Sequence, residues 1–150
     1  MIKTISPDEF WSYPEVHELI EGYTAECHIS GLPPVNPDVQ MYRALHQMGA
    51  MKVLASFSDD TIIGFAVVMI SPVAHYSARL AVMESVYVDK KHRHGGTGGR
   101  LIKAAEAEAL EAGATGLFVS APSGGVLEAA MNGNKIGYAH SNSVYFKKLT

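Results

Sequence analysis

One segment of the 150-residue chain is more informative than any other, and it reads Glu84-Ser-Val-Tyr-Val-Asp-Lys-Lys-His-Arg-His-Gly-Gly-Thr-Gly-Gly-Arg-Leu-Ile102. Its alternating apolar residues predict a strand, and an Ala-rich helix follows over residues 101–112. Between them lie glycines at positions 95, 96, 98 and 99, with basic residues around them. Glycines let backbone amides approach a ligand, and a helix N-terminus carries about half a positive charge. The segment therefore predicts a cradle for a phosphate or a pyrophosphate.

The spacing of these glycines separates the ligand classes that use such a cradle. A P-loop ends in Gly-Lys-Ser/Thr, whereas Gly99 is followed here by Arg100 and Leu101. A dinucleotide-binding fingerprint of the form Gly-x-Gly-x-x-Gly, begun at Gly96, would require a glycine at the position of Leu101. A nucleotide-phosphate binder therefore stays only as a third interpretation.

The pattern Arg93-x-x-Gly96-x-Gly98 resembles the signature loop of the GNAT superfamily of N-acetyltransferases. Its setting agrees with that family, because a Val-x-Val strand precedes the loop and a helix and a buried strand follow it. The resemblance implies acetyl-CoA as cofactor, with its pyrophosphate on the loop amides and its pantetheine arm between two splayed strands. The implied cofactor-binding residues are Val86, Val88, Arg93, His94, Gly95, Gly96, Thr97, Gly98, Gly99, Arg100 and Ser123.

The rest of the chain predicts one mixed α/β (α+β) domain over residues 1–150. We expect strands at 1–5, 51–57, 61–70, 80–88 and 116–120, and a last one within 138–149. Helices are expected from residue 8 to about 23, with a kink or break at Pro14, and at 38–48, 101–112 and 126–132. Together with the resemblance, these elements imply a largely antiparallel sheet of six to seven strands, about four helices and a splayed central strand pair. Strict alternation in the 80–88 strand would place Val82, Glu84, Val86 and Val88 on one face and Met83, Ser85 and Tyr87 on the other.

One glutamate and two tyrosines are candidates for acid–base catalysis. Glu84 lies where many members of the family carry a glutamate that deprotonates the amine, and its apolar neighbours should raise its pKa. The alternative is a surface glutamate, or one that pairs with Arg79. No tyrosine stands where the family usually has one in the last helix, so Tyr138 or Tyr145 is the candidate acid for the leaving thiolate, unless the thiolate leaves to water without an enzyme acid. Core packing is the competing interpretation of Tyr138.

Charge is unevenly distributed along the chain, whose formal net charge is −3. Residues 1–60 carry nine acids and three bases, whereas residues 61–150 carry six acids and nine bases. The acidic half would suit a cationic amine acceptor, bound by the N-terminal helices and the loops at 31–37 and 73–79. A solvated helix face explains the same acids. They are Asp8, Glu9, Glu15, Glu18, Glu21 and Glu26.

These features favour an acetyl-CoA-dependent N-acetyltransferase, in which a primary amine of a small molecule, peptide or protein attacks directly in a ternary complex. The alternative is a non-catalytic GNAT-like module that binds CoA or a protein partner. The net charge argues against nucleic-acid binding, and the apolar run at residues 62–70 is too short for a membrane span. The histidines and the single Cys27 show no metal-ligand spacing. With no signal-peptide pattern, a cytoplasmic protein is expected, and a homodimer is left open.

Overall fold

The computed structural model describes residues 1–133 and 136–150 and contains one five-stranded sheet. Its strands are β1 (Ile2–Ile5), β2 (Met51–Ser58), β3 (Thr61–Val73), β4 (Ala78–Val88) and β5 (Ala114–Val119), in that spatial order. Each neighbouring pair is antiparallel except β4 and β5, which are parallel. The mixed, largely antiparallel α/β architecture is thus confirmed.

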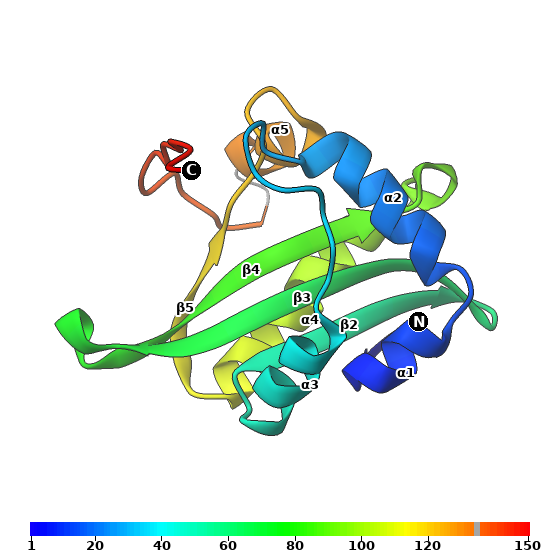
Figure 1. The fold of residues 1–150 in the computed structure, drawn as a ribbon, viewed down its shortest axis with the longest axis horizontal. Coiled ribbons are helices and arrows are strands. Elements are labelled where there is room, and N and C mark those ends of the chain that lie inside the picture. Colours follow the sequence, from blue (N-terminus) through cyan, green and yellow to red (C-terminus); the bar gives the residue numbers. More distant parts are fainter. Residues whose placement is uncertain (134–135) are drawn as a thin grey trace.

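Helices cover both faces of this sheet (Figure 1). Helices α1 (Pro7–Ser12), α2 (Val16–Cys27) and α3 (Val39–Gln47) pack on one face, where Phe10, Leu19 and Phe65 are buried. Helix α4 (Thr97–Glu111) packs on the other face, and α5 (Val126–Asn132) follows β5. Short 3-10 turns lie at Ala74–Tyr76 and Lys90–His92. None of the helices that the structure describes is both long enough and apolar enough to cross a membrane.

The N-terminal helical segment is divided in two at Pro14. Helix α1 begins with Pro7, a favourable first residue because proline lacks the amide hydrogen that a first turn leaves unpaired. The Ser6 hydroxyl accepts a hydrogen bond from the Glu9 amide at 3.1 Å and caps the helix. Pro14 lies between α1 and α2, so the predicted break is confirmed, and the described residues form five α-helices rather than about four.

A β-bulge in β4 overturns the predicted alternation of faces. Val67 pairs with Ser85 and Val68 with Met83, so Glu84 is the extra residue with no partner on β3. Glu84 and Ser85 consequently face the same side, toward α1–α3, whereas Val86 and Val88 pack on the α4 side. Glu84 therefore shares a face with Ser85, and not with Val86 and Val88.

The predicted last strand within residues 138–149 is wrong, and the sheet has five strands instead of six to seven. After β5 the described residues form helix α5 and then extend to the C-terminus without pairing to the sheet. Val144, Tyr145 and Leu149 are 79%, 91% and 87% exposed. The burial of one face offsets the entropy that a strand loses on ordering, and beyond Tyr138 every residue of this segment is exposed. Phe146 and Lys148 lie beside Gly31, in the loop after α2, and Tyr138 packs at the margin of the core on the α4 side.

Candidate functional site

Strands β4 and β5 separate at the level of Met83. Their pairing runs from Arg79 opposite Ala114 to Met83 opposite Val119, and β4 then continues to Val88 without β5 beside it. Figure 1 shows β5 turning away from β4 at this point. The outer edge of β4 over residues 84–88 therefore has no β5 partner. An extended molecule with amide groups can pair with such an edge, which is what the predicted splay requires.

The glycine loop (residues 89–96) joins the end of β4 to α4. Gly95 and Gly96 have φ of +90° and +76°, a conformation that disfavours residues with a Cβ atom. Gly96 is the N-cap of α4, and no side chain caps this helix end. The first amides of α4 are thus left for an external acceptor, as in other anion sites at helix N-termini.

Two further glycines, Gly98 and Gly99, lie in the first turn of α4, and no contact with the rest of the fold requires a glycine at either position. A Cβ atom on Gly99 would meet nothing within 4 Å, and one on Gly98 would only touch Val88 at 4.0 Å. Neither residue has a positive φ, and glycine within a helix costs about 1 kcal/mol relative to alanine. A ligand lying directly against the first turn of α4 would account for both. The residues present therefore fit a pyrophosphate.

Arg93 holds the glycine loop against the fold. Its Nε donates to the Val88 carbonyl oxygen at 2.9 Å, and its Nη2 donates to the Glu26 carboxylate at 2.9 and 3.0 Å. The guanidinium also lies over the ring of Tyr87, 5.2 Å from its centroid. Lys90 adds a second cation 3.4 Å from Glu26. Arg93 was predicted to contact the cofactor, and in the structure it connects β4, the glycine loop and α2.

Arg100 acts in the same way on the other side of the loop. One of its nitrogens donates to the Gly95 carbonyl oxygen, and Nη2 donates to the Thr97 hydroxyl at 3.1 Å. Of the other predicted cofactor residues, His94 is exposed on the loop, and Ser123 is exposed between β5 and α5.

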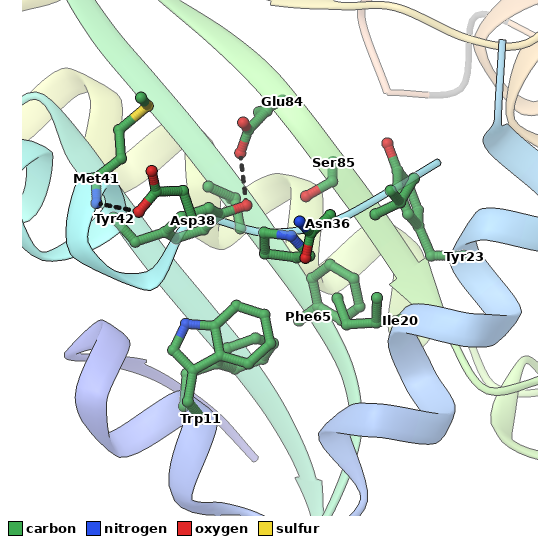
Figure 2. Close-up of a pocket in the computed structure, with 14 residues that line it drawn as sticks. Trp11, Ile20, Tyr23, Asn36, Asp38, Met41, Tyr42, Phe65, Glu84 and Ser85 are labelled. Atoms are coloured by element: carbon green, nitrogen blue, oxygen red, sulfur yellow. Dashed lines mark hydrogen bonds between the residues drawn. The ribbon is translucent and has the colours of Figure 1, made fainter. Parts of the chain in front are cut away.

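A cavity of about 360 Å³ lies between α1–α3 and the face of β3 and β4 (Figure 2). We call it the Glu84 pocket. Five aromatic side chains line it, and the loop before α3 closes one side. Its lining residues are Phe10, Trp11, Ile20, Tyr23, Val35, Asn36, Pro37, Asp38, Met41, Tyr42, Phe65, Val67, Glu84 and Ser85.

The carboxyl group of Glu84 accepts a hydrogen bond from the Tyr42 hydroxyl, with 3.3 Å between Oη and Oε2 (Figure 2). Burial raises the pKa of Glu84, and the bond from Tyr42 partly opposes that rise. Glu84 is exposed along one side because the pocket opens to solvent, but the pocket walls displace water from its carboxyl group. Burial also raises the pKa of Tyr42, so its hydroxyl stays protonated and donates. A carboxylate with a raised pKa holds a proton more strongly than an ordinary glutamate, which suits the role of a general base.

The second predicted catalytic residue, Tyr138, lies elsewhere. It packs at the margin of the hydrophobic cluster on the α4 side of the sheet and does not line the Glu84 pocket. Burial raises the pKa of Tyr138, and the nearby Glu106 carboxylate raises it further. The structure thus does not bring Glu84 and Tyr138 into one cavity.

The predicted acceptor region is present in part. Helices α1 and α2 and residues 35–37 line the Glu84 pocket and a neighbouring cavity of about 730 Å³, but the 73–79 loop lines neither. Two of the N-terminal acids are engaged in ion pairs, Asp8 with Arg43 and Glu26 with Arg93, and Glu21 Oε1 lies 3.2 Å from His17 Nε2. Among the described residues, no three His, Cys, Asp or Glu side chains gather as a metal site would require.

Comparison with known proteins identifies the same fold. A family model described as Acetyltransferase (GNAT) family matches residues 13–125. A ribosomal-protein-alanine N-acetyltransferase from Brucella melitensis biovar Abortus 2308 is 21% identical, with a TM-score of 0.72 and coverage of 100% of this chain and 99% of that one. An aminoglycoside acetyltransferase from an uncultured soil metagenomic sample, in complex with sisomicin, is 18% identical, with a TM-score of 0.78 and coverage of 100% and 95%. No curated protein sequence matches the chain.

Proposed function

The chain belongs to the GNAT family of acetyltransferases, and from this membership and the site geometry we propose that it transfers the acetyl group of acetyl-CoA to a primary amine. One observation carries the proposal. The open edge of β4, the glycine loop and the Glu84 carboxylate all belong to one continuous segment, residues 84–99. A cofactor site and a proton acceptor are therefore held next to each other by a single strand and the turn that follows it.

The cofactor would be held by backbone groups. The amides of Thr97, Gly98 and Gly99 would bind the pyrophosphate at the start of α4, and the β4 edge from Val86 to Val88 would pair with the pantetheine arm. Bound acetyl-CoA supplies a thioester, whose carbonyl carbon is the electrophile. Arg93 and Arg100 keep the loop in the shape that this binding needs.

The chain's own chemistry is that of proton transfer and positioning. Glu84 takes one proton from the acceptor ammonium, so that the nitrogen lone pair can attack the carbonyl carbon. As the amide bond forms and the carbon–sulfur bond breaks, the nitrogen loses a second proton, which passes to water. A β4 backbone amide donates to the carbonyl oxygen as it gains negative charge. Water is the simplest proton source for the leaving thiolate, since Tyr138 does not line the Glu84 pocket.

Replacement of Gly99 tests the cofactor site, because two side chains of nearly the same shape can be compared there, one negatively charged and one neutral. Its Cβ position is open, and an acidic residue in the first turn of a helix stabilises the helix, so Gly99→Asp should fold at least as well as wild type. We expect calorimetric titration to show acetyl-CoA affinity at least about tenfold weaker for Gly99→Asp than for the neutral control Gly99→Asn. Equal affinities, or no binding by the wild type at millimolar acetyl-CoA, would overturn the proposed site.

A non-catalytic CoA-binding module is the second candidate, and the position of Tyr138 outside the Glu84 pocket is what favours it. Release of free thiol from acetyl-CoA separates the two functions. A module would bind acetyl-CoA but would release no thiol above the buffer rate with any amine, whereas the transferase would release one thiol for each amide formed.

A further inference from the structure

We propose that the acceptor is a primary monoamine carried by a short chain on one aromatic or similarly flat apolar group, rather than a polycation. This inference rests on the proposed acetyl transfer and concerns the same pocket. The amine would lie at Glu84, and the apolar group would lie among the rings of α1, α2 and α3.

The aromatic side chains of the Glu84 pocket form a pre-arranged wall. Trp11 meets Tyr42 edge-to-face at a centroid separation of 5.9 Å, and it meets Phe10 in the same manner at 5.0 Å. Phe65 continues the series, 5.4 Å from Phe10 and 6.1 Å from Tyr23. Rings that already hold one another in place bind a flat apolar group with little loss of side-chain entropy.

The charges of the pocket match one ammonium group. Two carboxylates line it, Glu84 and Asp38, and Asp38 is the N-cap of α3, where its side chain accepts from the Met41 amide at 3.0 Å. Asp38 stays charged, but the N-terminus of α3 carries about half a positive charge that compensates part of it, whereas Glu84 has no such compensation. A second ammonium group would meet aromatic and aliphatic walls and would lose hydration without an ionic partner.

The neighbouring cavity does not supply the missing acids. It shares Trp11, Ile20 and residues 35–37 with the Glu84 pocket, and its one acidic lining residue is Glu21, whose Oε1 lies 3.2 Å from His17 Nε2. The Glu84 pocket itself, at about 360 Å³, is at the small end of the range for ligand sites. Volume and charge therefore agree on a compact acceptor with one charge.

The arrangement in space supports the assignment of the two ends. In Figure 2, Glu84 and Trp11 lie on opposite sides of the cavity, with Ser85 near the acid and Ile20 and Phe65 toward the apolar side. An ammonium at Glu84 would also lie near Tyr42, whose hydroxyl already contacts the acid.

The direct test compares kcat/KM for four acceptors at saturating acetyl-CoA. We expect 2-phenylethylamine to exceed ethylamine and spermidine by at least about tenfold, because only the first fills the aromatic end and keeps a single charge. Kanamycin serves as the aminoglycoside arm. A larger kcat/KM for spermidine or kanamycin than for 2-phenylethylamine would overturn the inference while leaving acetyl transfer intact.

Substitutions of residues that line the Glu84 pocket test whether this pocket sets the preference among amines. Trp11→Ala should raise the KM for 2-phenylethylamine about tenfold with little change in kcat, whereas Tyr76→Ala, an exposed aromatic outside both cavities, should leave both unchanged. Met41 is 58% exposed, so substitutions there should not disturb folding. Met41→Lys should weaken the binding of 2-phenylethylamine, because the lysine ammonium repels the ammonium of the ligand. Met41→Gln is its neutral control. An unchanged KM in both Trp11→Ala and Met41→Lys contradicts the inference.

Binding measured without turnover separates this inference from the proposed function. Calorimetry with 2-phenylethylamine should show a dissociation constant at least about tenfold lower than that of ethylamine, and Trp11→Ala should abolish the difference. If that holds but no amine releases thiol, the transferase proposal fails and the ligand class stands. If both amines bind equally, the ligand class fails whatever the turnover.

Discussion

A single extra residue in β4 gives Glu84 its environment. The bulge removes Glu84 from the regular pairing with β3 and turns its side chain toward the pocket beside Ser85. The surrounding walls then raise the pKa of the carboxyl group, and Tyr42 limits that rise. The proton affinity of the proposed base is therefore set by two opposing contacts, which mutation can separate.

Tyr42→Phe should shift the acidic limb of the pH–rate profile to higher pH. The Tyr42 hydroxyl stabilises the charged form of Glu84, so its removal raises the pKa of Glu84 further. The base is active above its pKa, and activity is lost as pH falls through that value. The profile of kcat/KM measures the shift, and Tyr23→Phe, a hydroxyl deletion in the same pocket, is the control. A limb that moves equally in both variants, or in neither, contradicts the account.

At the residue scale, the sequence could predict Glu84 and the glycines but not Tyr42. Glu84 and the glycine loop lie in one continuous segment, and the resemblance of that segment to the GNAT family points to both. Tyr42 reaches Glu84 from 42 residues away, and only the docking of α3 on the sheet brings the two together. The bulge was also missed, because strict alternation is the default expectation for a strand.

At the scale of elements, α2 connects the two halves of the site. Ile20 and Tyr23 line the Glu84 pocket, and Glu26 near the end of the same helix binds Arg93 of the glycine loop. Gly22, on the same helix, faces Tyr87, and the guanidinium of Arg93 stacks over the Tyr87 ring. Helix α2 can pack this closely on β4 because Gly22 has no side chain.

Gly22→Ala should destabilise the fold even though alanine favours helices. The new Cβ atom would collide with the Tyr87 hydroxyl and lie 2.6 Å from its ring carbon Cζ. Overpacking of this kind costs about 1–3 kcal/mol. Gly99→Ala is the matched control in α4, where the Cβ position is open and stability should rise by up to about 1 kcal/mol. Urea denaturation measures both. Equal stabilisation by the two substitutions would show that α2 is not held against Tyr87.

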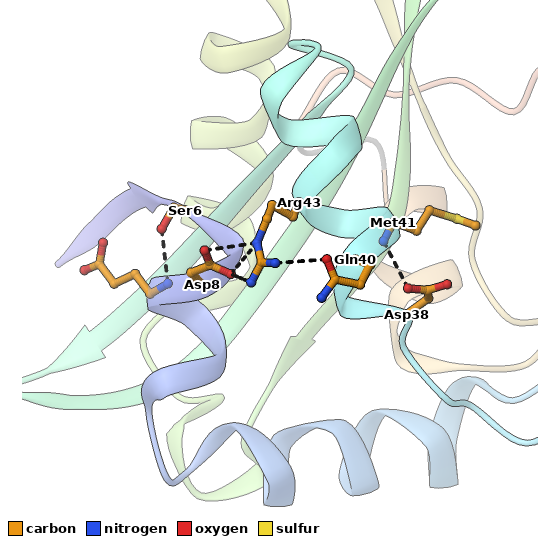
Figure 3. Close-up of polar contacts among 7 residues, drawn as sticks. Ser6, Asp8, Asp38, Gln40, Met41 and Arg43 are labelled. Carbon is orange, nitrogen blue, oxygen red and sulfur yellow. Dashed lines mark hydrogen bonds and ion pairs between the residues drawn. The ribbon is translucent and has the colours of Figure 1, made fainter.

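An ion pair joins helices α1 and α3, and it lies next to Tyr42, the hydrogen-bond partner of the proposed base Glu84. Arg43 Nη2 lies 2.8 Å from Asp8 Oδ1, and its Nε donates to both Asp8 oxygens at 3.2 Å (Figure 3). Arg43 also donates to Gln40 within α3 at 2.9 Å. Because Tyr42 precedes Arg43, this contact helps fix the helix that presents Tyr42 to Glu84.

The Asp8–Arg43 contact should give stability that disappears in acid. The hydrogen bonds from Arg43 hold the pKa of Asp8 below its ordinary value of 3.8. A depressed folded-state pKa contributes stability above the unfolded value, and this contribution is lost as pH falls through the folded value. We expect Asp8→Asn to melt below wild type at neutral pH and the difference to shrink as pH falls below 3.8. Glu9→Gln, an acid removed from the same first turn, is the control. A difference independent of pH contradicts the ion-pair explanation.

At the scale of the whole molecule, the sequence predicted the order of elements up to α5 and failed beyond it. Alternation, turn residues and caps are local signals, and they located β1 to β5 and the helices within a few residues. Pairing of a terminal segment to an edge strand is a long-range event that local signals do not report. The stretch Val144-Tyr-Phe-Lys147 has strand-like residues, but it is exposed and unpaired.

Removal of residues 140–150 should therefore change stability little. Every one of these side chains is exposed, and exposed groups typically contribute within about 0.5 kcal/mol each. The melting temperature should fall by no more than about 3 °C, most of it from the Phe146 contact at Gly31. Phe146→Ala in the full chain isolates that contact. A fall of more than about 10 °C on truncation would mean that the segment pairs with β5 in solution.

The most direct test of acetyl transfer by this chain is mass spectrometry of the amine after incubation with acetyl-CoA, with thiol release followed in parallel. Wild type should form the N-acetylated amine and one free thiol per product. Glu84→Gln should be at least about 100-fold slower near neutral pH, and the gap should narrow at high pH, where the amine is already neutral. No acetylated product from any primary amine, or equal rates for the two proteins, would contradict the account.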